Sequence, residues 1–115
     1  MNTDQTFPRT ARLTSPEEFK IVFRNAKKLN FKVFTVYILA NNLPESRLGL
    51  AISKKSAKKA VSRNLIKRII RDSFRLRRHR LTGWDIVFVS RIGVVDMSKP
   101  ELEALIRKVW KRIES

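Results

Sequence analysis

The chain has 115 residues, and its 26 Lys and Arg against 10 Asp and Glu give a formal net charge of +16. This length suits one globular domain over residues 1–115, and the charge implies a polyanionic partner, with nucleic acid the leading candidate. The absence of cysteine excludes disulfides, thiolate metal sites and thiol nucleophiles. No apolar run approaches the roughly 18 residues of a membrane span, so we expect a cytoplasmic protein with no signal peptide and no membrane partner.

The positive charge is concentrated in one part of the chain. Residues 54–80 hold twelve Lys and Arg and one Asp, which is +11 of the total of +16. A polyanion is therefore expected to attach there. A basic amphipathic helix also suits an anionic lipid surface, which leaves a membrane-surface role open.

The first predicted element is a helix that begins at Pro16. Ser15 and Glu18 form the capping-box pattern, and the proline occupies the first helical position. Lys27-Lys28 suits the carboxyl end of the helix dipole, so the helix is expected to end near Lys28. Its apolar residues at helical spacing form one stripe: Phe19, Val22, Phe23 and Ala26.

Two strands are predicted next, over residues 31–40 and 47–53, with a turn at 41–46 between them. In the first strand, alternation puts Phe31, Val33, Thr35, Tyr37 and Leu39 on one face and Lys32, Phe34, Val36 and Ile38 on the other. In the second, Leu48, Leu50 and Ile52 share a face, opposite Gly49, Ala51 and Ser53. The small residues of the latter face would allow another backbone to approach closely.

A basic helix is predicted between about Ser56 and Arg80, and it is expected to be the main binding element. On a helical wheel an apolar stripe, expected to pack on the sheet, is formed by Val61, Leu65, Ile66, Ile69 and Leu76. A basic ridge on the other side is formed by Arg63, Lys67, Arg71 and Arg75, with Asn64 and Arg78 between them. The ridge has Asp72 as its only acid, so its charges repel one another until phosphates neutralise them.

The last two elements are a buried strand and an amphipathic helix. The apolar run at residues 85–90 indicates the strand, and a second capping-box pattern at Ser98 and Glu101 opens the helix. The predicted order is α-β-β-α-β-α. This order favours an α+β fold in which helices pack on one small sheet.

The sequence lacks the groups that catalysis needs. The single histidine, His79, lies in a basic run at a helix end, and the acidic residues of first helical turns are explained by capping. Asp85 and Asp96 could meet a hydrated Mg²⁺, but they show no recognisable metal-ligand spacing. We therefore expect no catalytic residue and no metal site in the protein.

Aromatic side chains offer stacking platforms for single-stranded RNA, although most aromatic residues at such spacings belong to the core. The candidates are Phe19, Phe23, Phe31, Phe34 and Tyr37. Phe34 shares a face with Val36 and Ile38, so the core is the favoured place for it. Phe19, Phe23 and Tyr37 stay open between core and binding surface.

Residues 47–80, RLGLAISKKSAKKAVSRNLIKRIIRDSFRLRRHR, closely resemble the signature of the bacterial ribonuclease P protein subunit. The likeness extends over nearly the whole chain, from Phe7 to the Lys-Val-Trp-Lys-Arg ending, and residues 73–77 resemble the gamma-proteobacterial branch. The resemblance implies an α-β-β-(β)-α-β-α sandwich on a small mixed sheet, like the second domain of ribosomal protein S5. It also implies a left-handed β-α-β crossover, which general topology rules make improbable, and a flexible segment at 1–12.

Carried over residue by residue, the resemblance implies two binding sites. The catalytic RNA subunit would be bound by Lys54, Lys55, Lys58, Lys59, Arg63, Asn64, Lys67, Arg68, Arg71 and Arg75. The single-stranded 5′ leader of precursor tRNA would lie in a cleft lined by Phe19, Phe23, Phe31, Tyr37 and Ser53.

The resemblance also implies how the work is divided. Hydrolysis would reside in the RNA subunit and use Mg²⁺, with no cofactor in the protein, one RNA per protein and no obligate protein partner. The protein would favour precursor over product and broaden substrate specificity. One residue departs from the family motif: Leu65 stands where an arginine is usual, and its place in the apolar stripe predicts that it packs without strain.

Three rival functions remain open at this point. A ribosomal or RNA-chaperone protein has the same charge and size, a protein nuclease would cut RNA alone, and a DNA-compacting protein would prefer duplex DNA. The aromatic cleft and the spacing from Arg63 to Arg71 favour the ribonuclease P subunit over a ribosomal or RNA-chaperone protein. The missing acid/base groups argue against a nuclease, and a preference for duplex DNA over structured RNA would support the DNA-compacting alternative.

Overall fold

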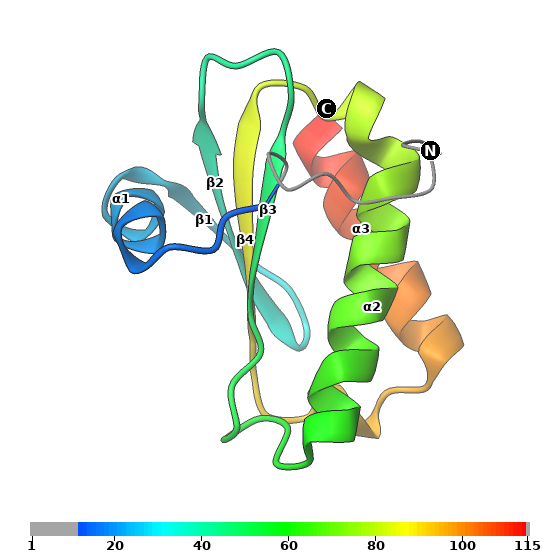
Figure 1. Ribbon diagram of the computed structural model, residues 1–115. Coiled ribbons are helices and arrows are strands. Elements are labelled where there is room, and N and C mark those ends of the chain that lie inside the picture. Colours follow the sequence, from blue (N-terminus) through cyan, green and yellow to red (C-terminus); the bar gives the residue numbers. More distant parts are fainter. Residues whose placement is uncertain (1–11, 115) are drawn as a thin grey trace, which may run out of the picture.

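The computed structural model describes residues 12–114, so most of the predicted flexible segment at 1–12, with Phe7, lies outside the described residues. Figure 1 shows three layers: one helix, a four-stranded sheet, and two further helices on the opposite face. The elements are α1 (Pro16–Asn25), β1 (Lys27–Asn30), β2 (Phe34–Ala40), β3 (Arg47–Ala51), α2 (Ala60–Arg77), β4 (Trp84–Ser90) and α3 (Lys99–Glu114), with 3₁₀ turns at Arg78–Arg80 and Val94–Asp96. This is the α+β class that the sequence predicted.

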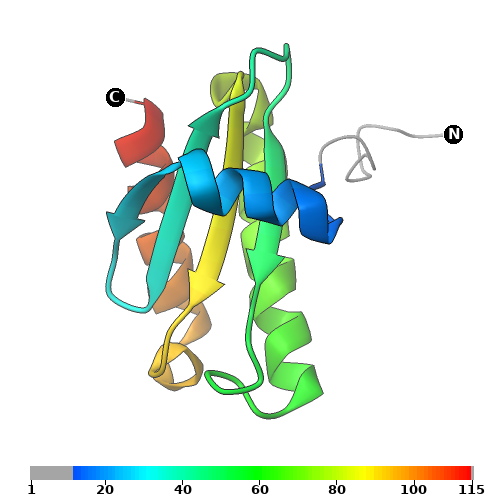
Figure 2. The ribbon, with the colours of Figure 1, turned by 90° about the vertical axis from the view of Figure 1, so that its left-hand side faces the viewer.

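The sheet is mixed and has the order β1-β2-β4-β3. β1 and β4 pair antiparallel with β2, whereas β3 pairs parallel with β4 and forms an edge. The connection from β3 to β4 runs through α2. In Figure 2, α2 lies behind the sheet, both strands run downward and β4 stands to the left of β3, so this crossover is left-handed as the resemblance implied.

The chain between α1 and β2 differs from the prediction. The helix ends at Asn25 instead of Lys28, because Ala26 is extended, and residues 27–30 form strand β1. A hydrogen bond from the Phe31 N–H to the Phe34 carbonyl closes a tight turn, so the predicted strand over 31–40 begins only at Phe34. Of the β1 side chains only Leu29 is buried. A polar edge strand of this kind carries little hydrophobic signal in the sequence.

Two apolar clusters lie on the two faces of the sheet. The predicted alternation in β2 is confirmed, because Phe34, Val36 and Ile38 are buried towards α2 and α3, while Tyr37 and Leu39 pack on the α1 side. The smaller cluster under α1 is centred on Leu13, Val22 and Val87. The alternating faces of β2 thus supply both clusters.

The apolar stripe predicted for α2 is only partly right. Ile66 and Ile69 are buried as predicted, but Val61 and Leu76 are 73% and 70% exposed, and the helix buries Ile70 and Phe74 in their place. The helix is thus turned by roughly 100° from the predicted orientation. The reason is tertiary: the indole of Trp110 on α3 packs on Phe74, with ring centroids 5.8 Å apart, and donates a hydrogen bond to Ser73 Oγ.

Both predicted capping boxes are present. Ser15 and Glu18 bond reciprocally at the start of α1, and Ser98 and Glu101 do the same at the start of α3. These bonds fix where each helix begins. Among the described helices, none has the length and apolar content needed to cross a bilayer.

Candidate nucleic-acid interface

The loop between β3 and α2 presents four lysines and is held by serine hydroxyls. Ser53 Oγ accepts the Ser56 N–H at 3.1 Å, and Ser56 Oγ lies 2.5 Å from Ser90 Oγ at the end of β4. The Ala57 N–H bonds to the Ser53 carbonyl at 2.9 Å. This network gives the loop a defined shape on which the exposed side chains of Lys54, Lys55, Lys58 and Lys59 stand.

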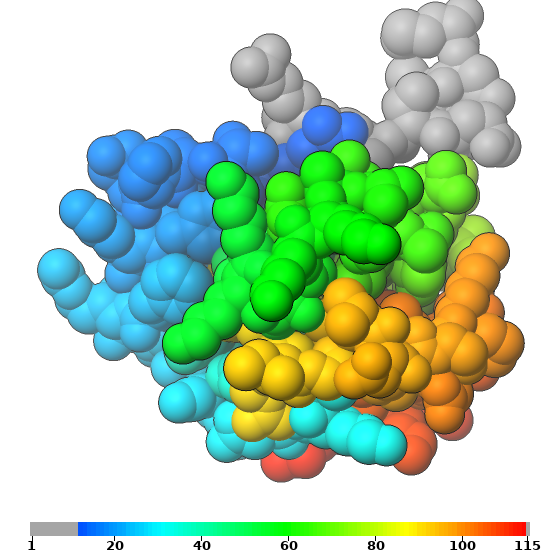
Figure 3. Space-filling model, turned by 90° about the horizontal axis from the view of Figure 1, so that it is seen from below, coloured from blue at the N-terminus to red at the C-terminus, as the bar shows by residue number. Residues whose placement is uncertain are grey.

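Arg63 connects this loop to the helix. Its Nη1 donates to the carbonyls of Ala57 and Lys58, at 2.9 and 2.8 Å. The guanidinium therefore orients the lysine loop as well as adding a charge. In Figure 3, which views the molecule from below, this loop (green) lies between α1 (blue) and the segment that follows β4 (yellow and orange).

The remaining basic residues lie along one flank of α2. Asn64 and Arg68 are exposed, and Lys67, Arg71 and Arg75 are half-buried. Arg75 lies 3.8 Å from Asp72, the one acid of this flank. Arg78, which the ridge was predicted to include, lies in the following 3₁₀ turn and pairs with Glu45 at 2.5 Å. The structure thus brings the predicted RNA-binding residues together on α2 and the loop before it.

Leu65 does not pack in the core as predicted. It is 45% exposed and lines an open groove with Asn64, Arg68 and Arg71. The rotation of α2 explains the difference, since the centre of the predicted stripe now faces outwards. The position where the family usually has an arginine is therefore a surface position.

Three aromatic rings form a ladder from α1 to the sheet. The centroids of Phe19 and Phe23 are 6.0 Å apart, and Phe23 meets Tyr37 edge-on at 4.9 Å. Phe23 is 42% exposed, so one face of the ladder is open to a ligand. The face of β3 that was predicted to carry small residues leaves room for the ladder, because the ring of Phe19 lies over Gly49.

The structure does not bring Phe31 to this ladder. Phe31 packs against the cluster on the α2–α3 side of the sheet, with Val33, which is buried there. Because the chain turns at residues 31–34 before β2 begins, neither residue lies on the face of the sheet that carries Tyr37. Ser53, the last predicted residue of the cleft, is exposed and lies two residues beyond the end of β3.

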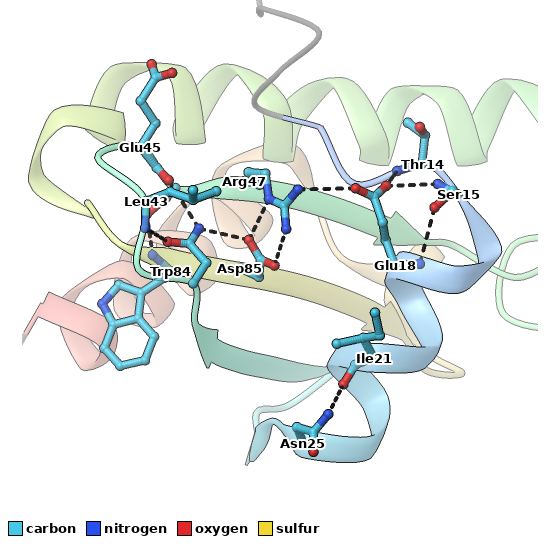
Figure 4. A network of polar contacts seen from close by, with 12 residues as sticks. Thr14, Ser15, Glu18, Ile21, Asn25, Leu43, Glu45, Arg47, Trp84 and Asp85 are labelled. Carbon is cyan, nitrogen blue, oxygen red and sulfur yellow. Dashed lines mark hydrogen bonds and ion pairs between the residues drawn. The ribbon is translucent and has the colours of Figure 1, made fainter.

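An ion-pair network that the sequence did not reveal fixes α1 on the sheet (Figure 4). Arg47 on β3 donates to both carboxylate oxygens of Asp85 at 2.8 and 2.7 Å, and to Glu18 of the capping box at 3.2 Å. Asn41 donates to the same Asp85 at 2.9 Å. Asp85, considered in the sequence as a possible neighbour of Mg²⁺, is thus engaged in holding the fold.

The basic flank and the aromatic ladder meet at the edge strand β3. Phe19 and Arg71 both line a pocket of about 190 Å³, together with Arg12 and Leu48. Burial, followed by the nearby charge of Arg12, lowers the pKa of Arg71 below its usual value. An anion at this point would relieve the repulsion between the two guanidinium groups. Cations next to open aromatic rings are typical of proteins that bind RNA.

Comparison with known proteins names the family within that class. The family model described as Ribonuclease P matches residues 7–114. The "Ribonuclease P protein component" of Thioalkalivibrio sulfidiphilus is 42% identical over 115 residues, which is 100% of this chain and 96% of that protein. The chain therefore belongs to the ribonuclease P protein family and is an RNA-binding protein of tRNA processing.

Solved structures agree with this assignment. The RNase P protein of Staphylococcus aureus superposes with a TM-score of 0.82 at 29% identity, covering 89% of this chain and 94% of that one. That of Thermotoga maritima gives 0.79 at 29% identity, covering 90% and 98%. The ribosomal or RNA-chaperone alternative is not favoured by these relatives.

Proposed function

We propose that α2 and the lysine loop bind the catalytic RNA subunit of ribonuclease P, one RNA per protein, while the aromatic ladder binds the 5′ leader of precursor tRNA. The observation that carries the proposal is the pocket at the β3 edge, where Phe19 and Arg71 meet. A strand leaving the RNA subunit would pass from the cations to the rings without crossing an acidic surface. The complex is expected to act in the cytoplasm.

The proposal assigns phosphodiester hydrolysis, and the Mg²⁺ it uses, to the RNA subunit. Within residues 12–114, no three His, Asp or Glu side chains come together as ion ligands. Asp85, considered in the sequence as a possible neighbour of Mg²⁺, has both carboxylate oxygens hydrogen-bonded to Arg47. The proposal assigns binding and positioning to the protein's own residues.

Leader binding explains how a non-catalytic protein helps the reaction. The ladder contacts a part of the precursor that the product lacks, so its binding energy favours substrate over product. Stacking on aromatic rings tolerates any base, which allows leaders of different sequence and broadens the range of substrates. The cations of α2 reduce phosphate repulsion where RNA subunit and leader approach each other.

The RNA-subunit site is tested by the salt dependence of binding. Replacing Lys67 and Arg71 by alanine should weaken binding and reduce the slope of log K against log salt by about 0.7–0.9 for each lost phosphate contact. Lys108→Ala with Lys111→Ala is the matched control, since it removes two exposed cations from α3. Equal slopes for the two double variants would overturn the assignment.

The leader site is tested by comparing precursor with mature tRNA in the presence of the RNA subunit. Phe23→Ala should lower the affinity for precursor by about tenfold, the loss expected when one base stops stacking, and spare mature tRNA. Ile21→Ala on the same helix is the control, because Ile21 is 57% exposed and is not part of the ladder. Equal losses for precursor and mature tRNA would contradict the leader assignment.

A further inference from the structure

A groove runs between α2 and α3, on the side of α2 that faces away from the ladder. It has a volume of about 260 Å³, and its walls come from both helices. The residues that line it are Leu65, Arg68, Ile69, Asp72, Ser73, Leu76 and Arg77 from α2, and Lys99, Glu103 and Arg107 from α3. Neither the basic flank nor the ladder accounts for this groove.

The groove carries excess positive charge. Four cations and two acids line it, which leaves a net charge of +2. Arg77 is paired with Glu114 at 3.1 Å. Arg68, Lys99 and Arg107 form no ion pair within residues 12–114, so these three are available to an external anion.

The floor of the groove is apolar and accessible. Leu65 and Leu76 are 45% and 70% exposed. Leu65 also lines a smaller hollow with Val95, which is half exposed, at the start of α3. An apolar floor between cationic walls matches a nucleic-acid strand, whose bases and riboses are apolar on their faces and whose phosphates are anionic.

We infer that the α2–α3 groove is a second contact for the RNA subunit, in addition to the flank of α2 proposed above, on which this inference rests. Lys99 and Arg107 hold the backbone of one RNA strand, and Leu65 on the floor of the groove contacts a base or ribose. Lys99 and Arg107 are about 12 Å apart along the α3 axis, so they reach different phosphates. Arg68 lines both this groove and the open groove of the flank, which makes the two contacts continuous.

The first test removes the cations of α3. Lys99→Ala with Arg107→Ala should weaken binding of the ribonuclease P RNA by about tenfold and lower the salt slope by about 0.7–0.9 for each contact. Lys108→Ala with Lys111→Ala carries the same charge change at two positions of α3 that do not line the groove, and it should leave both quantities as in the wild type. Equal effects of the two double variants would overturn the inference.

The second test is a gain of affinity, which misfolding cannot imitate. Glu103 faces the groove and would lie near the phosphates, so Glu103→Gln should strengthen RNA binding by about threefold. Glu17→Gln changes the net charge equally on α1 and serves as the control. An affinity for Glu103→Gln no higher than that of Glu17→Gln would contradict an RNA occupant and leave a protein partner as the alternative.

The third test locates the RNA directly. The chain has no cysteine, so a single introduced cysteine carries a cleaving reagent at one known position. Iron-EDTA attached to Glu103→Cys should cut one short segment of the RNA subunit, whereas Lys108→Cys should not. The opposite pattern would overturn the inference.

The proposed function is tested separately, by the variants of Lys67 and Arg71. If these variants alone leave RNA binding and its salt slope unchanged, the proposed function is contradicted, whereas the result for the groove is not affected.

Discussion

The ring of Phe19 lies directly over Gly49: a Cβ at position 49 would be 3.0 Å from two of its ring carbon atoms and 3.1 Å from the Cβ of Leu13. α1 packs this closely because β3 presents no side chain there. The glycine thereby sets the height of the aromatic ladder above the sheet. The same contact closes one wall of the pocket that leads to Arg71.

Gly49→Ala should therefore displace Phe19 and disturb leader binding. We expect the free energy of unfolding to fall by about 1–3 kcal/mol, the usual cost of overpacking a filled site. Precursor affinity should fall while the affinity for the RNA subunit stays close to that of the wild type. Urea unfolding and precursor binding check the two effects, and a variant with unchanged precursor affinity would show that the position of Phe19 does not matter.

Arg63 should stabilise the lysine loop as well as contribute a positive charge to RNA binding. In the free protein, Arg63→Ala removes the bonds to the carbonyls of Ala57 and Lys58, so stability should fall by about 1 kcal/mol. The amide of Ala57 should exchange its hydrogen faster. Arg63→Lys keeps the charge but not the forked donor, so it should accelerate exchange while leaving the salt slope of RNA binding intact. An unchanged rate of hydrogen exchange at Ala57 in both variants would show that Arg63 does not hold the loop.

Glu18 should make the attachment of α1 sensitive to acid. Hydrogen bonds from the Ser15 backbone, with smaller effects of Thr14 and Arg47, lower the pKa of Glu18 from its usual 4.5. A carboxyl with a lowered folded pKa stabilises the fold above its unfolded pKa, and this contribution is lost as pH falls through the folded value. Stability should thus decline below about pH 4.5. Glu18→Gln should decline less over that range, and an identical decline would contradict this role.

Leu65→Arg should restore a contact that the family motif usually provides. Because Leu65 is 45% exposed, the change should alter stability by no more than about 0.5 kcal/mol. The added charge should raise the salt slope of RNA-subunit binding by about 0.7–0.9. Ile66→Arg is the contrasting variant, since the neighbouring Ile66 is buried and a charge there should unfold the protein. A large loss of stability in Leu65→Arg would indicate that α2 is oriented as the wheel predicted.

Local patterns predicted every helix and strand except β1, and long-range contacts decided how they pack. Capping boxes located the starts of α1 and α3, and strand alternation assigned Phe34 to the core, because these signals act within a few residues. The buried face of α2 could not be predicted in the same way. The helix holds two overlapping apolar arcs, and Trp110, far along the chain, selects the one that contains Phe74.

In the candidate site, too, local patterns predicted some features and long-range contacts decided the others. The cations of α2 are adjacent in sequence and lie together in the structure. The ion pair of Arg47 and Asp85 joins residues 38 positions apart, so no local pattern predicts it. Phe31 was grouped with Tyr37 on the assumption of an unbroken strand, and the turn at residues 31–34 separates them.

The central claim is that this protein assists an RNA enzyme by binding its RNA and the leader of its substrate. It is tested most directly by cleavage of a 5′-labelled precursor tRNA at low Mg²⁺, comparing the protein alone, bacterial ribonuclease P RNA alone and both together. We predict efficient cleavage at the mature 5′ end only for the combination. Cleavage by the protein alone, or a rate for the RNA that the protein does not increase, would contradict the claim.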